Sequence, residues 1–230
     1  MTVTADELLT DDSAADFNPS DEVMARIARV ARPQPVMSRE TYAALSDRQR
    51  EILSDVGVLF SEGFKHLTMA EIASALNCSL RTLYTVAKSR EELVLIVVDR
   101  SLWAIGREAR DAIVPDMEPL DAIRAYLRAS TVAVASITEA FANDTDSTPA
   151  ALAVHSAHNA YLASATQALL NEAVRRGAIA RCDTAAVSKI IAGLGRQFAS
   201  SEMISTLRSS PKKAADDMVD VILLGLEAKR

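Results

Sequence analysis

The stretch TMAEIASALNCSLRTLYT, residues 68–85, decides the fold because it encodes two short helices joined by a tight turn. Thr68 is a good N-cap, and Glu71 three residues later completes a capping box for a helix of about nine residues. Asn77 begins the turn, since Asn tolerates the left-handed backbone conformation that a tight connection demands. Ser79 then caps a second short helix that ends near the close of the stretch.

A third helix precedes this pair. From Asp47 the sequence has a strong helical period that stops at Gly63. Its apolar face consists of Ile52, Val56, Leu59 and Phe60. Three short helices, with a tight turn between the second and the third, are typical of a helix-turn-helix.

Residues 47–95 resemble the DNA-binding domain of TetR-family transcriptional regulators. Besides residues 68–85, the matching elements are Gly63-Phe64 and the run KSREEL at residues 88–93. Four positions depart from the family pattern: Arg81 replaces a small residue, Val86-Ala87 replace an aromatic pair, and Asn77 replaces a glycine.

DNA recognition needs a helix that enters the major groove and phosphate contacts that fix it on each side. We expect Arg81 to read guanine, since its guanidinium can pair bidentately with that base. We expect Lys65, Thr68, Tyr84 and Lys88 to touch phosphates. The whole predicted interface is Lys65, Thr68, Ser79, Leu80, Arg81, Thr82, Tyr84, Thr85 and Lys88.

Each of these residues also has a structural alternative. Thr68 and Ser79 would cap helices with or without DNA, and the Tyr84 ring could pack against the first helix. Lys65, Arg81 and Lys88 could be ordinary surface charges. Leu83 and Cys78 are expected to lie in the core between the helices.

Composition agrees with an all-α protein. Forty alanines stand against seven glycines, seven prolines and ten aromatic residues, a balance that favours helix over strand. No apolar run reaches the roughly 18 residues that a membrane span requires, and no secretory signal is apparent. Two cysteines are too few for a disulfide scaffold and match no metal spacing. We expect a cytoplasmic protein in which both are reduced thiols. The net charge of −6 argues against non-specific wrapping of nucleic acid but permits a small local DNA-binding surface.

Residues 1–46 form an N-terminal extension. Residues 1–20 hold five acids and no base, and we expect a disordered tail. Ser20 could cap a short helix that ends before Pro33. Its arginines, Arg26, Arg29 and Arg32, form either a solvated basic face or an arm that reaches phosphates or a minor groove.

The remaining chain predicts longer helices and gives about nine helices in total. The resemblance implies a helix-turn-helix domain at 47–92 and an effector-binding and dimerisation domain at 93–230. Ser89 caps a helix that runs to about Ile113. A helix follows Pro119 and carries an apolar stripe through Val134, Ile137 and Phe141. The further predicted elements are a polar loop at 143–149, a helix at 150–176 ended by Gly177, a helix capped by Asp183 or Thr184, and a last helix opened by Pro211.

The resemblance to TetR-family regulators implies an effector site in the middle helices and a homodimer formed by the last two helices. Candidate ligand-binding residues are Trp103, Arg107, Arg110, Tyr126, Ser130, His158, Tyr161 and Leu162. The candidate dimer interface is Val187, Ile191, Leu194, Phe198, Met218, Val221 and Ile222, for which burial within the same chain is the alternative.

The sequence therefore predicts a regulator, with repression as the default, that binds a palindromic operator as a dimer and is released by a small, largely apolar effector. A helical interaction module that has lost DNA binding is the alternative. No catalytic motif is recognisable, and no cofactor is expected. His155 and His158 could share a helix face as metal ligands, but no third ligand is obvious nearby, so no metal is expected.

Overall fold

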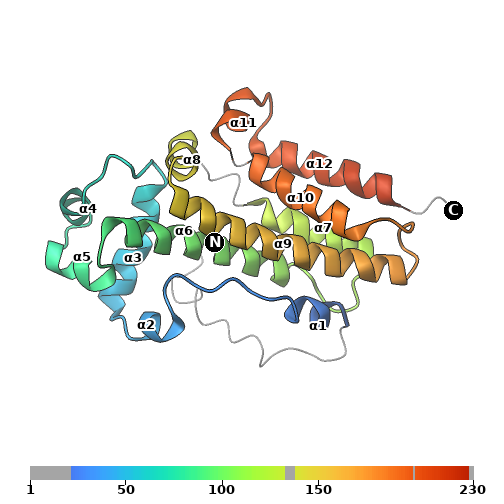
Figure 1. The fold of residues 1–230 in the computed structure, drawn as a ribbon, viewed down its shortest axis with the longest axis horizontal. Coiled ribbons are helices and arrows are strands. Elements are labelled where there is room, and N and C mark those ends of the chain that lie inside the picture. The colour runs from blue at the N-terminus through green and yellow to red at the C-terminus, as the bar shows by residue number, and fades with distance from the viewer. Residues whose placement is uncertain (1–21, 133–137, 199, 228–230) are drawn as a thin grey trace. The chain divides into compact units, whose positions relative to one another are not determined.

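The structure, a computed structural model, describes residues 22–132, 138–198 and 200–227 (Figure 1). Within these ranges the chain forms twelve helices and no strand, and the one isolated bridge pairs Ile179 with Glu227. The all-α prediction is confirmed. None of the described helices combines the length and apolar character needed to cross a bilayer. The predicted acidic tail, the Ser20 cap and the stripe positions Val134 and Ile137 lie outside the described residues.

The chain divides into two compact units. In its described part, the first unit comprises residues 34–104 and 138–155. It contains α2 (Arg39–Ala43), α3 (Asp47–Phe60), α4 (Met69–Ala75), α5 (Leu80–Val86), the first part of α6 (Arg90–Asp111), α8 (Glu139–Asp146) and the first residues of α9 (Pro149–Arg175).

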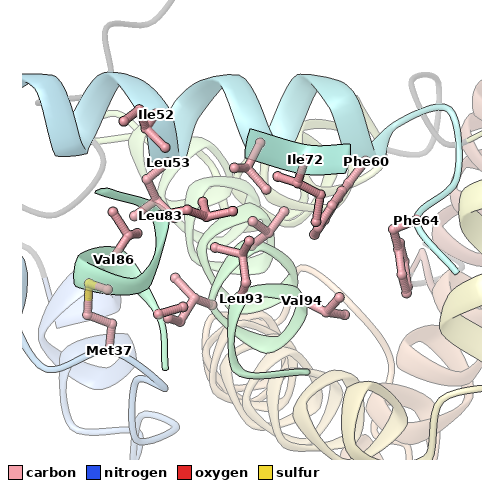
Figure 2. Packing of buried hydrophobic residues seen from close by; sticks show 14 of the residues in the cluster. Met37, Ile52, Leu53, Phe60, Phe64, Ile72, Leu83, Val86, Leu93 and Val94 are labelled. Atoms are coloured by element: carbon pink, nitrogen blue, oxygen red, sulfur yellow. The ribbon is translucent and has the colours of Figure 1, made fainter. Parts of the chain in front are cut away.

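The core of the first unit is built from the apolar faces of α3, α4, α5 and α6, whose side chains converge in Figure 2. Ile52, Ile72, Leu83 and Leu93 are fully buried there, one from each helix. Residues of the N-terminal extension join the same core. They are Met37, Tyr42 and Leu45.

The second unit comprises the described residues 22–33, 105–132, 156–198 and 200–227. It contains α1 (Glu22–Ala28), α7 (Pro119–Ser130), α10 (Thr184–Phe198), α11 (Ser201–Thr206), α12 (Pro211–Leu226) and the remainders of α6 and α9. Ile27 of α1, Ile123 of α7 and Leu223 of α12 are buried together in its core.

Most predicted helix ends are confirmed, because they depend on local hydrogen bonds. The Thr68–Glu71 capping box is present, and Ser79 caps α5. Asn77 has a φ of 48° and Gly177 a φ of 71°, as the turn and the helix end require. Of the two candidate caps for α10, Asp183 accepts the hydrogen bond from the Ala186 amide.

Two predictions in the middle of the chain are wrong. The single helix expected from Pro119 to Phe141 ends at Ser130, and Phe141 belongs to α8. The polar loop expected at 143–149 is mostly the last half of α8, because the Thr138 side chain caps a helix that tolerates polar residues on its exposed side. The short helices α2 and α11 were not predicted, which accounts with α8 for twelve helices instead of nine.

Candidate nucleic-acid interface

Helix α5 is held by its cap and by two buried side chains. The Ser79 hydroxyl oxygen accepts a hydrogen bond from the Thr82 amide at 3.0 Å, which fixes the first turn. Leu83 and Val86 point into the core of the first unit (Figure 2). Their burial fixes which face of α5 is turned to solvent.

The outward face of α5 carries exposed apolar and polar side chains. Leu80 is 42% and Tyr84 48% exposed, and Arg81 and Thr85 are exposed beside them. The Tyr84 ring is therefore not packed into the core, whereas Leu83 is buried and Cys78 packs against the same cluster. This face has the mixture of cation, hydroxyl and apolar groups that meets base edges and thymine methyl groups in a major groove.

Polar contacts tie the ends of α5 to its neighbours. Gln49 of α3 donates a hydrogen bond from Nε2 to the Thr85 hydroxyl at 2.7 Å. The Lys88 amide donates to a carboxylate oxygen of Glu92 at 2.6 Å, and the Lys88 side chain is exposed. The sequence indicated Thr85 and Lys88 as interface residues but gave no sign of Gln49, whose partner lies 36 residues away.

The first turn of α4 presents Thr68 at an exposed helix end. The Glu71 carboxylate accepts hydrogen bonds from the Thr68 amide at 2.8 Å and from its hydroxyl at 2.7 Å. These bonds, with the hydroxyl contributing most, lower the pKa of Glu71 below its usual value. The Thr68 hydroxyl thus serves as a cap in the free protein.

Lys65 lies in the turn between α3 and α4 and is exposed. Its ammonium donates a hydrogen bond to the Ser147 hydroxyl at 3.1 Å. Arg90, which sequence reasoning gave no role, donates to the carbonyl oxygens of Leu67 at 2.5 Å and Phe64 at 2.6 Å. Arg90 therefore fixes the same turn from α6.

The three arginines of the predicted N-terminal arm have different surroundings. Arg26 lies 3.6 Å from the buried carboxylate of Glu172 in the second unit. Arg29 and Arg32 are exposed. Arg26 thus forms an ion pair within the chain, whereas Arg29 and Arg32 remain on the surface.

Four of the predicted ligand-binding residues are buried polar side chains of the second unit. Arg110, Tyr126, His158 and Tyr161 are all buried. Burial and the neighbouring Tyr161 raise the pKa of Tyr126, which keeps its phenol neutral. Of the remaining candidates, Leu162 packs against the same core, the Ser130 hydroxyl bonds the Leu127 carbonyl, and Arg107 and, in the first unit, Trp103 are half-buried.

The predicted dimer residues mostly face the core of their own chain. Ile191 and Phe198 are buried, and Val221 is exposed. Val187, Leu194, Met218 and Ile222 are partly buried against the same clusters. Among the described residues of these helices, the large apolar side chains that are exposed are Ile190, Val221 and Leu224, between 60% and 67% exposed.

Comparison with known proteins finds likeness in structure only. The sequence matches no protein-family profile and no curated protein. A regulatory protein of the TetR family from Rhodococcus RHA1 has a TM-score of 0.62 at 18% identity, covering 81% of this chain and 100% of that one. The TetR-family regulator PfmR from Thermus thermophilus has a TM-score of 0.57 at 21% identity, covering 77% and 99%. A TetR-family regulator from Agrobacterium tumefaciens has a TM-score of 0.62 at 15% identity, covering 79% and 98%. This chain therefore has the fold of these regulators, and about a fifth of it has no counterpart in them.

Proposed function

We propose that this chain is a DNA-binding transcriptional regulator that inserts α5 into the major groove. The outward face of α5 carries the proposal, because Leu80, Arg81 and Tyr84 are exposed on a helix whose other face is fully packed. The fold shared with TetR-family regulators supports the same function. Repression by blocking a promoter is the default mode of control for such a protein.

The first experiment selects bound duplexes from a random DNA pool with the purified protein and measures affinity for the recovered sequence. Arg81→Ala should weaken binding to that sequence by about 1 to 3 kcal/mol and relax preference at one base position. Lys88→Ala should weaken all sequences alike and reduce the salt slope by about one unit, since it removes a phosphate contact.

Arg208→Ala is the matched control, because Arg208 is an exposed arginine of the second unit. It removes the same charge and should leave specificity unchanged. Equal losses on selected and random DNA for Arg81→Ala would make that residue a phosphate contact instead of a base contact. Failure of the selection to enrich any sequence would favour the alternative, a helical interaction module without specific DNA binding.

We also propose that the protein acts as a homodimer on a palindromic operator. One short recognition helix per chain needs a two-fold partner to reach a second half-site. The apolar residues Ile190, Val221 and Leu224 support this proposal, since exposed apolar side chains on neighbouring helices are typical of an interface. Within this proposal they replace the buried members of the predicted set as the residues that meet the partner.

Leu224→Glu tests the dimer by placing a charge at its centre. We expect light scattering to change from the mass of two chains to that of one, with operator affinity falling at the same time. Val58→Glu is the control, because Val58 is an equally exposed apolar residue on α3 of the first unit. A dimer that persists in Leu224→Glu would place the interface elsewhere.

We propose that a small, largely apolar effector binds among the candidate residues of the second unit and releases DNA. Arg110, Tyr126 and Tyr161 support this part, since a few buried polar groups in an apolar core are typical of ligand sites. Thermodynamic reciprocity requires operator DNA to weaken the effector by the same factor. Screening of a small-molecule library by Trp103 fluorescence, with and without operator duplex, tests both statements.

A further inference from the structure

One carboxylate of α8 accepts two hydrogen bonds from the turn between α3 and α4. An oxygen of Asp144 accepts from the Phe64 amide at 2.6 Å and from the Lys65 amide at 2.7 Å. Neither amide has a partner inside a helix, because both residues lie between α3 and α4. Bonds from amides to an ionised acceptor are stronger than bonds between neutral groups. Asp144 is therefore a strong anchor for this turn.

Further contacts bring α8 and the turn together. The Thr138 hydroxyl donates to the Ser61 carbonyl at 2.5 Å, so the first turn of α8 is tied to the end of α3. The Phe141 ring meets the Phe64 ring edge-on, with centroids 5.7 Å apart. With the Lys65–Ser147 hydrogen bond, these contacts extend along the whole of α8.

Gly63 shows how close the approach is. It has a φ of 97°, which a side chain rarely adopts. A Cβ atom there would lie 3.2 Å from the Ala140 Cβ and 3.3 Å from the Asp144 carboxylate. The backbone of the turn thus lies directly against α8.

The turn ends at Thr68, the first residue of the exposed α4 end described above. Lys65 lies three residues before Thr68, so a shift of the backbone at Phe64 and Lys65 would displace that end of α4. Helix α4 in turn packs against α5. DNA recognition depends on placing both helices to within a fraction of an ångström.

We propose that Asp144 is a positioning residue for DNA binding: its carboxylate holds the turn at Phe64 and Lys65 and thereby sets where α4 meets the phosphate backbone. This inference rests on the proposed function. It assigns to α8, a helix distant in sequence from the helix-turn-helix, a direct part in the geometry of the DNA-binding surface.

Removing the Asp144 charge and losing its positioning role should change DNA affinity in opposite directions. The two effects can therefore be told apart. Removal of a negative charge close to a DNA-binding surface by itself strengthens DNA binding. Asp144→Ala should nevertheless weaken binding to the selected duplex about tenfold, because the Phe64 and Lys65 amides lose their charged acceptor and the turn is no longer held in place. Asp144→Asn keeps an oxygen acceptor and should recover much of the loss.

Asp146→Ala is the matched control, since Asp146 is an exposed aspartate on the same helix. It removes the same charge and should bind the selected duplex as well as the unaltered protein, or slightly better. Binding of Asp144→Ala to a random duplex should weaken less than its binding to the selected duplex, because phosphate contacts can form in more than one register whereas base contacts cannot. A merely destabilised protein would instead lose both kinds of binding together. Equal affinities of the two alanine variants for the selected duplex would overturn the proposal.

Hydrogen exchange in the free protein separates this inference from the proposed function. The amides of Phe64 and Lys65 should exchange slowly in the unaltered protein and at least tenfold faster in Asp144→Ala, with other peptides of the first unit unchanged. If the unaltered protein selects no DNA sequence, the proposed function fails whatever the exchange rates. If it binds DNA but the two amides exchange equally in both proteins, Asp144 does not hold the turn.

Discussion

Glu172 in α9 and Arg100 in α6 are both buried ionisable side chains, but their charges are compensated in different ways. The Glu172 side chain is 1% exposed and faces three cations. Arg175 donates to it at 2.5 and 2.9 Å, Arg176 donates at 2.6 Å, and Arg26 lies 3.6 Å away. The guanidinium groups of these three arginines thus compensate the negative charge of Glu172.

Arg100 is 7% exposed and lies over the Tyr42 ring, with its central carbon 4.7 Å from the ring centroid. Within the part of the chain that the structure describes, its Nη1 and Nη2 atoms have no hydrogen-bond acceptor. A ring face stabilises a cation less than a carboxylate does. We infer that burial of charge stabilises the second unit at Glu172 and costs stability in the first unit at Arg100.

The largest expected effect follows Glu172→Gln. The variant leaves three guanidinium groups around an uncharged amide and should lower the free energy of unfolding by about 3 kcal/mol. The hydrogen bonds from Arg175 and Arg176 lower the pKa of Glu172 to about 2, with the Arg175 bond contributing most. Because the folded pKa lies below the unfolded one, this stabilisation is complete above about pH 5 and disappears as the pH falls towards 2.

Urea denaturation at several pH values between 3 and 7 measures this effect. The difference between the unaltered protein and Glu172→Gln should shrink as the pH falls. Glu108→Gln, at an exposed position of α6, is the control and should show no such trend. A difference that is constant across the range would mean that the variant acts through packing and not through charge.

Tyr42→Leu should have the next largest effect. It removes the ring beneath Arg100 and beside Arg50, whose central carbon lies 5.6 Å from the ring centroid. We expect a loss of about 2 kcal/mol in the first unit, from the lost ring contacts and the two uncovered cations. Tyr42→Phe keeps the ring and should lose less than half as much free energy of unfolding. Thermal unfolding of the two variants measures both losses. Equal losses in both variants would assign the effect to the hydroxyl group.

Arg100→Met should change stability in the opposite direction. Replacing a buried cation that lacks an acceptor with an apolar side chain of similar length should raise the free energy of unfolding by about 1 kcal/mol. Arg208→Met, at an exposed position, should leave it unchanged. A loss of stability in Arg100→Met would show that the Tyr42 ring compensates the charge fully, and the contrast with Glu172 would then disappear.

The smallest effect is expected for Arg26→Gln. Its side chain is partly exposed and its distance to Glu172 is the longest of the three. A loss below about 0.5 kcal/mol is expected, because the Arg26 guanidinium is solvated and Arg175 and Arg176 still bind the carboxylate. Arg176→Gln should cost more in the same measurement, because Arg176 donates a short hydrogen bond to the carboxylate. The reverse order would make the N-terminal extension the main partner of Glu172.

The part of the fold that sequence reasoning found depends on contacts between near neighbours. The Thr68 capping box and the Asn77 turn span three or four residues, so the residue types alone indicate them. The part it missed depends on distant partners. Asp144 bonds amides 79 and 80 residues away, and no local pattern marks it.

The terminal helices illustrate a second limit. An apolar stripe at helical spacing identified Ile191 and Phe198 as residues that must be covered, and both are buried. The spacing of apolar residues along a helix does not show whether the surface that buries them belongs to the same chain or to a partner. The same spacing puts Ile190 on the stripe and predicts that it faces inward, but Ile190 is exposed, so this prediction is wrong. The exposed Leu224 was left out, because it lies beside the apolar positions of the last helix.

The N-terminal extension also affects how the protein can be produced. Ile27 is buried in the core of the second unit, and Met37, Tyr42 and Leu45 are buried in the core of the first. An expression clone trimmed to begin at Asp47, where the helix-turn-helix starts, would remove all four and leave apolar surface open to water in both units. Such a shortened protein would tend to aggregate, whereas an affinity tag placed before residue 22 would leave these four positions intact.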